Sequence, residues 1–353
     1  MKILHVAETI KGGVATVIRQ LVAKKTGDEL FCLIPHDQKS ELSGDNEKIL
    51  TFIRTGRNAK SFLSLASLFI RIVINDRPDV IHIHSSFAGV ICRTLLMFTF
   101  FIYRPRVIYC PHAFSFLMDI STTKKKIYAL LEKILQSVTD EIICVSNHEK
   151  MQAIHYGLSP KKLKVIYNGV TAPVSNVDEF KSPFNSNRVN ILFVGRLDYQ
   201  KGFDIVLQLA DKLNDEFLIT VIGATVHAKD TFANHPLIDF KGWLKSDEIA
   251  PYFYFADVLI MPSRWESFGL VAVEAQSYGL PVIASNTTSL PEVVLDKKTG
   301  FLFPNEDANM LYNILISHNK TDWIKMGGDC FDFYKKNFTS ERMIDETYRL
   351  YKG

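Results

Sequence analysis

The chain has 353 residues, of which 47% are hydrophobic and 22% are charged, and its formal net charge at pH 7 is +3. This is the composition of a folded, water-soluble protein without repeats or low-complexity tracts, and the length exceeds what one hydrophobic core usually serves, so two domains are expected. Residues 1–180 hold 23 basic and 16 acidic side chains, whereas the remainder holds 18 and 22. This asymmetry indicates either an anionic partner of the first half or a chance distribution of surface charge.

The cysteines and the N-terminus bear on the compartment. Five cysteines are scattered along the chain with no C-x-x-C pair, which fits reduced thiols in the cytosol better than disulfides or a zinc site. The opening MKILHVAETI predicts a strand rather than a signal peptide, and no run of about 18 uncharged apolar residues predicts a membrane span. We therefore expect a cytoplasmic protein.

Short apolar runs alternate with helical patterns through the first half of the chain. The predicted strands cover residues 2–7, 29–35, 79–86, 106–112, 141–147 and 164–170. Runs that are apolar almost throughout are typical of parallel strands covered on both faces. A first doubly wound α/β domain is therefore predicted over residues 1–175.

A polar stretch, residues 171–188, contains two prolines, three serines and three asparagines and predicts a linker. The same alternation then resumes over a second predicted domain, residues 189–337. Its predicted strands are 190–197, 217–224, 237–243, 257–263, 281–285 and 300–304, and its predicted helices are 202–214, 246–255, 270–279, 307–318 and 322–337. A last helix, about residues 338–353, is free to pack back on the first domain. Two such domains place ligands at the carboxyl ends of their strands, with the cleft between them as the expected active site.

The stretch RWESFGLVAVEAQSYG, residues 264–279, places Glu266 in the loop after a predicted strand and Glu274 on the next helix. Gly269 allows a ligand to approach the backbone, and the amides that begin the helix suit an anion such as a pyrophosphate. Glu274 needs a partner on a mostly apolar helix, and sugar hydroxyls can donate to a carboxylate. Two acids beside one pyrophosphate describe a nucleotide-sugar site; an exposed Glu266 with a salt-bridged Glu274 is the alternative.

A second stretch, FVGRLDYQKGFD, ends a predicted strand, turns at Gly195, and offers Arg196 and Lys201 before a helix. Two cations at the carboxyl end of a strand can neutralise a diphosphate as it departs. A solvated turn is the alternative.

The combination of VGRL…KG, PSRWESFGLVAVEA, GLPVIAS and LPEVV…TGFLFP closely resembles the retaining glycosyltransferases of family 4, which have the GT-B fold and include enzymes of bacterial cell-surface polysaccharide synthesis. The likeness extends over nearly the whole chain, and GGV, DVIHIHS, PHAF, CVSN and VIYNGV in the first half have looser counterparts. It implies two Rossmann-like domains facing a central cleft, the first on the acceptor side and the second binding the nucleotide-sugar.

The resemblance also implies roles for individual residues. Arg196 and Lys201 would bind the donor diphosphate and stabilise the leaving group, Glu266 would contact hydroxyls of the transferred sugar, and Glu274 would bind the nucleotide ribose. His112 would face the transferred sugar across the cleft. Backbone positions expected to bind the donor are Gly12, Gly13, Gly195, Phe268, Gly269 and Leu270.

One segment departs from the family pattern. Family members often have a Gly-Gly pair after the strand that matches PVIAS, whereas this chain has NTTSL at residues 286–290. The shape of this loop bears on which donor is accepted.

Other residues of the first half are weighed against simpler interpretations. His82 and His84 alternate along a strand and share a face, so both are interpreted as structural, with a place at the rim of the site as the alternative for His84. Gly12-Gly13 is not a G-x-G-x-x-G fingerprint and no P-loop occurs, which disfavours a nicotinamide-dependent oxidoreductase. No D-x-D occurs either, so we expect no cofactor and no obligatory metal, with charge on the leaving group stabilised by side-chain cations and a helix start.

Residues 87–106 are unusually apolar and aromatic, with arginines in or beside them, and KKK follows at 124–126. A buried crossover helix is one interpretation. The other is a surface that docks peripherally on anionic lipid at the inner face of the plasma membrane.

The sequence therefore favours a retaining hexosyltransferase. It would move a hexosyl or N-acetylhexosaminyl group from a nucleotide-diphosphate sugar, with UDP the expected carrier, to a sugar hydroxyl of a glycan or glycolipid acceptor during O-antigen or capsule synthesis. The acceptor is expected to be lipid-linked, and no nucleic-acid partner is expected. The alternatives are a GT-B sugar-nucleotide epimerase, a phosphorylase and a non-catalytic sugar-nucleotide-binding subunit, with an oxidoreductase last.

Overall fold

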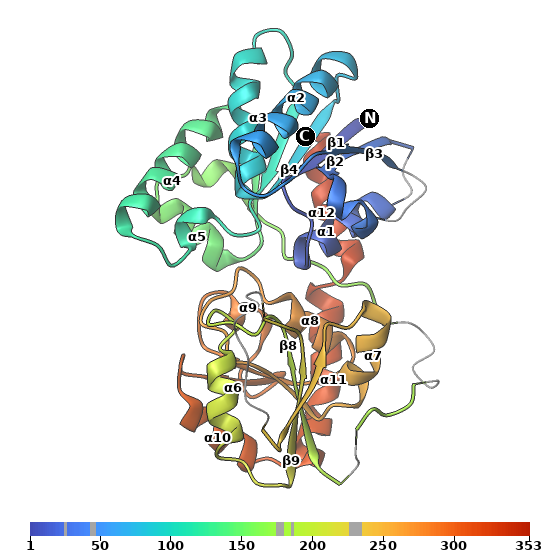
Figure 1. Cartoon of the computed structure of the whole chain (residues 1–353), viewed down its shortest axis with the longest axis vertical. Helices are drawn as coiled ribbons and strands as arrows, with labels where there is room; N and C mark the ends of the chain where they lie inside the picture. The colour runs from blue at the N-terminus through green and yellow to red at the C-terminus, as the bar shows by residue number, and fades with distance from the viewer. Residues whose placement is uncertain (25–26, 43–46, 174–179, 185–186, 226–234) are drawn as a thin grey trace. The chain divides into compact units, whose positions relative to one another are not determined.

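A computed structural model describes residues 1–24, 27–42, 47–173, 180–184, 187–225 and 235–353. The chain divides into two compact units, the first comprising Met1–Asn168 with Glu341–Gly353 and the second Gly169–Ser340, each built on its own sheet (Figure 1). The predicted linker, residues 171–188, lies partly outside the described residues. The last helix returns to the first unit.

The first unit contains a seven-stranded parallel sheet in the order β3-β2-β1-β4-β5-β6-β7. Its strands are β1 (Lys2–Ala7), β2 (Glu29–Pro35), β3 (Glu47–Phe52), β4 (Val80–His84), β5 (Arg106–Cys110), β6 (Glu141–Cys144) and β7 (Leu163–Val165). The strand β3 was absent from the sequence-based prediction. It lies at the edge of the sheet, where Lys48 is exposed and Ile49 and Leu50 are only partly buried, so it lacks the continuous apolar run of the central strands.

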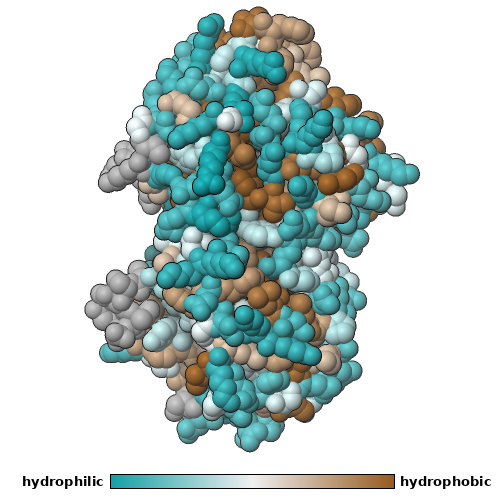
Figure 2. Space-filling view, turned by 180° about the vertical axis from the view of Figure 1, so that it is seen from behind, coloured by the Kyte–Doolittle hydropathy of each residue, from teal (hydrophilic) through white to brown (hydrophobic). Residues whose placement is uncertain are grey.

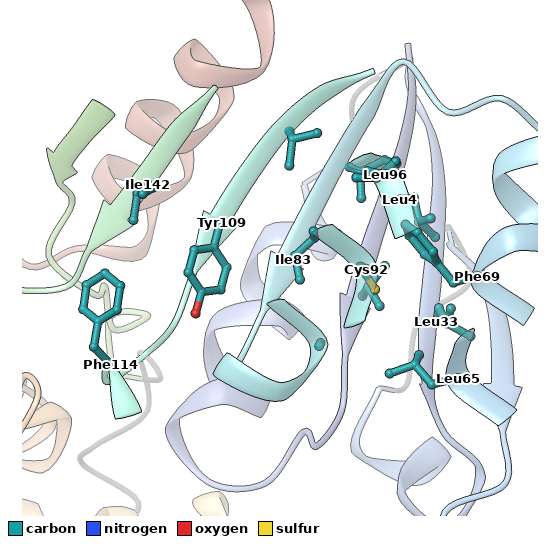
Figure 3. Packing of buried hydrophobic residues seen from close by; sticks show 14 of the residues in the cluster. Leu4, Leu33, Leu65, Phe69, Ile83, Cys92, Leu96, Tyr109, Phe114 and Ile142 are labelled. Carbon is teal, nitrogen blue, oxygen red and sulfur yellow. The ribbon is translucent and has the colours of Figure 1, made fainter. Parts of the chain in front are cut away.

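Helices cover both faces of this sheet (Figure 1). They are α1 (Gly13–Ala23), α2 (Ala59–Asn75), α3 (Ser86–Thr99), α4 (Thr122–Leu135), α5 (Asn147–His155) and α12 (Ser340–Lys352), with short 3-10 turns η1 (His36–Glu41), η2 (Ser115–Leu117), η3 (Gln136–Val138) and η4 (Pro160–Lys162). Figure 3 shows the core on one face, where Leu65 and Phe69 of α2 and Cys92 and Leu96 of α3 pack against Ile83 and its neighbouring strands. Because side chains alternate along a strand, the other face is left to α1 and α12.

The helix α12 is attached to the first unit by specific contacts. The Tyr348 hydroxyl donates to the backbone oxygen of Leu21 in α1 at 3.4 Å, and Lys24 forms an ion pair with Asp345 at 2.5 Å. Tyr351 is buried and its hydroxyl lies 2.6 Å from His82 Nδ1. The last residues of the chain therefore complete the core of the first unit.

The second unit contains a six-stranded parallel sheet in the order β10-β9-β8-β11-β12-β13. Its strands are β8 (Val189–Val194), β9 (Phe217–Ile222), β10 (Ile238–Gly242), β11 (Val258–Met261), β12 (Val282–Ser285) and β13 (Gly300–Phe303), and its helices are α6 (Phe203–Ala210), α7 (Ser246–Phe255), α8 (Leu270–Ser277), α9 (Leu290–Val293), α10 (Ala308–Ile316) and α11 (Lys320–Asn337). The predicted fold class, two Rossmann-like α/β domains, is confirmed.

Each sheet has one point where the strand order reverses, between β1 and β4 in the first and between β8 and β11 in the second. Loops that leave neighbouring strands at such a point run in opposite directions and open a crevice, where α/β proteins bind ligands. The carboxyl ends of β8 and β11 lead directly into the two stretches that carry the predicted donor-binding residues.

Candidate active site

The turn between β8 and α6 presents two cations at the switch point of the second sheet. Asp198 organises the turn: its carboxylate lies 3.2 Å from Arg196 Nη2 and accepts a hydrogen bond from the backbone amide of Lys201 at 2.9 Å. Gly202 begins α6 with φ +67°, and a Cβ there would lie 2.0 Å from the backbone oxygen of Pro262, the residue after β11. Only glycine therefore lets this turn approach the neighbouring strand so closely.

Lys201 and Glu266 form an ion pair across this switch point. The ammonium lies 2.5 Å from Glu266 Oε1, which also accepts a hydrogen bond from the Ser263 hydroxyl at 3.0 Å. The side chains of Lys201 and Glu266 are 18% and 9% exposed, so both charges are mostly removed from water and depend on each other. Lys201, which is proposed to bind phosphate, thus lies beside Glu266, which is proposed to bind the sugar.

Arg264 holds the loop after β11 against the turn after β8. Its guanidinium donates two hydrogen bonds of 2.7 Å to the carboxylate of Asp204, donates to Glu306, and stacks at 3.7 Å over the Tyr199 ring. A bidentate, stacked guanidinium fixes both distance and orientation. Arg264 is therefore a structural clamp between the two loops that bear Lys201 and Glu266.

The segment that departs from the family pattern, residues 286–290, fixes the backbone of Glu266. The Glu266 amide donates to Thr288 Oγ1 at 2.9 Å, and the Ser289 hydroxyl donates to the backbone oxygen of Glu266 at 3.1 Å. Thr288 adopts φ +47°, an unusual conformation for a β-branched residue. Side-chain hydroxyls thus determine the position of the carboxylate that is expected to contact the sugar.

Glu274 lies one turn into α8 and is partly buried. Its carboxylate has no hydrogen bond or ion pair in the described part of the chain. Burial raises the pKa of this carboxyl group to about 7, and the nearby charge of Lys201 opposes the shift. The side chain is therefore poised to accept hydrogen bonds from a ligand, as its proposed ribose-binding role requires.

Phe268, Gly269 and Leu270 form the backbone at the start of α8. Gly269 has φ +96°, and a Cβ there would lie 2.9 Å from a methyl group of Leu290. Phe268 is 2% exposed and its ring packs edge-on against Phe338. The first amides of the helix, beginning with Leu270, have no acceptor within the helix itself and are available to an anion.

His112 follows β5 in the first unit and adopts φ +56°, which is rare for a residue with a Cβ. Its Nε2 lies 3.0 Å from Nδ1 of His84, and burial lowers the pKa of His112 to about 4, so the ring is neutral at pH 7. His84 is fully buried. Its interpretation as a structural residue is confirmed and the alternative place at the rim is wrong, because alternation along β4 directs the ring into the layer beneath α12.

Gly12 and Gly13 lie where β1 leads into α1. Gly12 precedes the helix with φ +59°, and a Cβ added there would lie within 4 Å of no other described atom outside the neighbouring residues. They are thus at the switch point of the first sheet, and their proposed contacts with acceptor and phosphates, like that of His112 with the sugar, stay predictions.

The structure brings together the second-unit residues that the sequence singled out. The Asp198 carboxylate contacts both the Arg196 guanidinium and the Lys201 backbone amide. The Lys201 ammonium pairs with Glu266, and its charge also lowers the pKa of Glu274 against the effect of burial. Sequence reasoning assigned no role to the residues that support them, which are Asp198, Ser263, Arg264, Thr288, Ser289 and Gln200, whose side-chain oxygen accepts a hydrogen bond of 2.6 Å from Arg196 Nη2. Two signals were usable: Ser263 ends a predicted strand, and residues 286–290 depart from the family pattern. The bonds between the hydroxyls of residues 286–290 and Glu266 could not be predicted, because these contacts are set by tertiary structure.

Two family models match the chain. Glycosyltransferase Family 4 matches residues 11–172, and Glycosyl transferases group 1 matches residues 174–320. The chain is 42% identical to an uncharacterized 41.2 kDa protein in the cps region of Klebsiella pneumoniae over the whole of both chains. It is 27% identical to the UDP-Gal:alpha-D-GlcNAc-diphosphoundecaprenol alpha-1,3-galactosyltransferase of Escherichia coli, over 83% of this chain and 79% of that one.

Among solved structures, HepE from Anabaena in complex with UDP-glucose superposes with a TM-score of 0.79 at 16% identity, over 99% of this chain and 98% of that one. At this identity the structural similarity establishes only the fold, which consists of two Rossmann-like domains. The two family models together cover both units, and the Klebsiella relative is alike from end to end. The chain belongs to glycosyltransferase family 4, whose members have the GT-B fold.

Proposed function

We propose that the protein is a retaining glycosyltransferase that moves a hexosyl or N-acetylhexosaminyl group from a UDP-sugar to a sugar hydroxyl of a lipid-linked acceptor in surface polysaccharide synthesis. The observation that carries the proposal is the arrangement at the second switch point: Lys201 is paired with Glu266, and Glu274 lies nearby without a partner in the part of the chain that the structure describes. One cation between two acids suits a diphosphate that joins two sugar rings, because each ring offers hydroxyls to one carboxylate.

The choice of donor and acceptor follows two relatives. HepE was crystallised with UDP-glucose, and the Escherichia coli enzyme is named for transfer of galactose from UDP-galactose to an acceptor on diphosphoundecaprenol. The relative from Klebsiella is encoded in a cps region. These names support UDP as the carrier, a lipid-linked acceptor and a role in capsule or O-antigen synthesis.

Retention of the anomeric configuration is proposed with front-side attack. The acceptor oxygen bonds to the anomeric carbon on the face from which the diphosphate leaves, the bond to the diphosphate oxygen breaks, and the acceptor proton passes to a phosphate oxygen of the leaving group. Arg196 and Lys201 stabilise the charge that develops on that leaving group. Glu266 is not assigned as a nucleophile, because Lys201 and Ser263 already engage its carboxylate.

A two-step experiment tests the function. The purified protein is first screened by thermal shift against UDP, GDP, ADP and their sugars, and the true carrier should raise the melting temperature. The sugar so identified is then supplied with a lipid-linked acceptor, and NMR of the product reads the anomeric configuration. Hydrolysis or epimerisation of the donor without transfer would support the epimerase alternative, and binding without turnover would support a non-catalytic subunit.

Glu274→Gln is expected to weaken binding of UDP-glucose by about 10- to 100-fold, since hydrogen bonds from ribose hydroxyls to a charged acceptor are lost. In the wild type, donors favour the ionised carboxylate, whose pKa is about 7 in the free protein. Affinity should therefore fall about tenfold between pH 8 and pH 6, and the variant should lose this dependence. Calorimetric titration measures both, and the diphosphate diester of UDP-glucose does not itself titrate in this range.

The same variant separates binding from folding. A buried carboxylate with a raised pKa destabilises the fold at pH 8, so Glu274→Gln should raise the melting temperature of the free protein while lowering its affinity for the donor. A fall in both, or unchanged affinity at either pH, would contradict the ribose-binding role.

Transfer is expected to proceed without a divalent metal, because cations of the chain face the leaving group and the start of α8 offers amides to it. The rate in EDTA should equal the untreated rate. Loss of activity in EDTA, with recovery on addition of magnesium or manganese, would contradict this expectation.

The helix α4 has the surface expected for contact with a membrane. Its inward face carries Glu132, which is 4% exposed and accepts hydrogen bonds from Arg93 at 2.8 Å and from the Tyr109 hydroxyl at 3.0 Å. Its outward face instead carries apolar side chains that are 37–57% exposed, namely Ile127, Leu130, Leu131 and Ile134. An acid inside and an apolar stripe outside is the reverse of an ordinary surface helix.

Charge identifies the occupant of this stripe. Lys124, Lys125, Lys126 and Lys133 flank it, and Glu132 is the one acid of α4 and faces inward. The helix α3 packs beside α4, and the middle of α3 is a buried crossover segment. Near and beyond the C-terminal end of α3, Phe98 and Phe101 are 78% and 95% exposed. Hydrophobic patches lie among polar ones on the side of the first unit that carries α4 (Figure 2). Among the described residues, no helix combines the length and the apolar character needed to span a membrane. The exposed apolar stripe between lysines leads us to propose peripheral docking on anionic lipid.

Replacing Leu130 and Ile134 by Gln should abolish flotation with vesicles that contain phosphatidylglycerol, whereas the same change at the exposed Leu63 and Ile74 of α2 should not. Wild-type protein should float with these vesicles at low salt and far less with phosphatidylcholine alone. Equal flotation of the α4 and α2 variants would show that α4 is not the docking surface.

A further inference from the structure

The rings of His5, His82, His84 and His112 lie together in the first unit, and the proposed function uses His112 alone. His112 Nε2 lies 3.0 Å from His84 Nδ1, and His84 Nε2 lies 3.2 Å from His5 Nδ1. Adjacent rings are nearly parallel, at 18° in both pairs. We call His112, His84 and His5 the histidine string. It runs from a half-buried ring at the carboxyl edge of the sheet to a fully buried one in the core.

The sheet itself builds this string. β1 pairs with β4 so that Ala7 lies opposite His84, which places His5 and His84 on the same face two positions apart. β5 pairs with β4 so that Cys110 lies opposite His84, and the positive φ of His112 redirects the chain immediately afterwards. Three rings from three adjacent strands therefore meet end to end.

Each contact in the string needs one proton and one lone pair. Burial lowers the pKa of His5 and His112 to about 4 and that of His84 well below its ordinary value, so all three rings are neutral at pH 7 and each carries one N–H. Two of the three protons form the two ring-to-ring hydrogen bonds, so the remaining proton must lie on the outer nitrogen at one end of the string. Either His112 Nδ1 or His5 Nε2 carries it, and the direction of every bond follows.

The two ends are not equivalent. His5 Nε2 is buried and has no hydrogen-bond partner among the described residues. A proton there would be a buried donor without an acceptor, which folded proteins rarely tolerate. A proton on His112 Nδ1 instead lies on a half-buried ring at the carboxyl edge of the sheet. The string is therefore expected to donate from His5 to His84 and from His84 to His112.

We propose that His84 and His5 are positioning residues that fix the tautomer of His112, so that Nδ1 of His112 carries the proton and donates it in a hydrogen bond to an oxygen of the transferred sugar. This rests on the proposed function, which places His112 against that sugar. A fixed donor discriminates between a sugar hydroxyl that can accept and an apolar group that cannot, and the string supplies it without a charge.

A metal ion is the competing explanation of these rings, because His5, His82 and His84 can each offer a nitrogen and the three nitrogens lie within 4.8 Å of one another. Both nitrogens of His84 are already hydrogen-bonded within the string and His82 Nδ1 is bonded to the Tyr351 hydroxyl, so only Nε2 of His5 and Nε2 of His82 lack a hydrogen-bond partner among the described residues. A divalent ion would break the string and place its charge beside no carboxylate of this group. The hydrogen-bonded string therefore accounts for more of the contacts.

NMR of the full chain labelled with ¹⁵N-histidine tests the proposal, because nitrogen shifts and long-range couplings distinguish a protonated from a bare ring nitrogen. His112 of the wild type should show a protonated Nδ1 and a bare Nε2. His5→Met replaces the donor at the buried end with a weak acceptor, so the His112 signals should shift toward protonated Nε2. His82→Met is the matched control: equally buried on the same face but outside the string, it should leave the His112 signals unchanged.

Kinetics supply a second readout. His5→Met should lower kcat/KM by about two- to tenfold, as expected for a weakened neutral hydrogen bond, with affinity for UDP unchanged because UDP lacks the sugar. Wild-type protein with Nε2 of His112 protonated would overturn the proposal, as would unchanged His112 signals in folded His5→Met, or one zinc ion per purified chain that His82→Met removes. The spectra need no turnover, so a locked His112 in a protein without transferase activity would refute the proposed function and leave the string intact.

Discussion

Lys201→Ala is expected to lower kcat by about 100-fold or more, with a much smaller effect on the affinity for UDP-sugar. In the free protein the ammonium lies against Glu266, and it is mostly shielded from water. When the glycosidic bond breaks, negative charge grows on the diphosphate, and a preorganised cation stabilises that charge more than it stabilises the bound donor. The loss should therefore be concentrated in the chemical step.

Single-turnover kinetics at saturating donor measure that step directly. Lys212→Ala is a suitable control, since Lys212 is exposed just beyond α6 in the same unit. Within the described ranges, Lys201→Ala leaves the Glu266 carboxylate with only the Ser263 hydroxyl as a partner, so Lys201→Ala/Glu266→Gln separates loss of the cation from an uncompensated acid. A kcat within threefold of the wild type in Lys201→Ala would show that Lys201 does not act on the leaving group.

Acid is expected to destabilise the first unit selectively. The folded pKa of His5 is about 4, whereas an unfolded histidine titrates near its ordinary value of 6.5. Between these values the unfolded chain binds more protons than the folded chain. The stability contributed by the neutral, buried His5 is therefore fully present above pH 6.5 and is lost as the pH falls toward 4. His5 alone accounts for about 2 kcal/mol at pH 5. His82, His84 and His112 shift in the same direction and add to the loss.

Hydrogen exchange at pH 7 and pH 5, corrected for the intrinsic rate, measures this effect in β1 and β4. The three tryptophans, Trp243, Trp265 and Trp323, all lie in the second unit, so their fluorescence follows that unit as an internal control. His5→Met should reduce the acid sensitivity of β1 and β4 by about 2 kcal/mol. Equal protection of these strands at both pH values would contradict the assignment of neutral, buried rings.

The sequence predicted the central strands of both units and the longer helices of the second unit, because each shows its own periodicity, whereas in the first unit it predicted only a crossover helix within residues 87–106 and the last helix. The edge strand β3 was missed, since a half-exposed strand beside charged residues lacks the apolar run on which the prediction relied. No bounds were predicted for α4, and its pattern is the reverse of an ordinary surface helix: apolar residues such as Leu130 are exposed, and Glu132 is buried because Arg93 and Tyr109 lie beneath it. Only the partners on α3 and β5 reveal this inversion.

The same limit applies to the candidate site. Arg196, Lys201 and Glu266 could be selected from the sequence because they follow the ends of apolar strands, and Glu274 because it is an acid on a mostly apolar helix; the family resemblance then implied their roles. The groups that fix their geometry, such as Thr288 and Arg264, act through contacts between loops 22 to 60 residues apart. The rim of the site was the alternative for His84 because alternation along β4 gives its face but not what covers that face, and α12 arrives from the end of the chain.

A crystal structure with UDP bound, or with whichever nucleotide diphosphate gives the largest thermal shift, tests the central claim most directly. We predict the two phosphates between Arg196, Lys201 and the first amides of α8, with both ribose hydroxyls donating to Glu274. Lys201 should exchange Glu266 for a phosphate oxygen and leave that carboxylate facing the empty sugar position. A nucleotide bound elsewhere, with the Lys201–Glu266 pair intact and Glu274 without a ligand contact, would contradict the account.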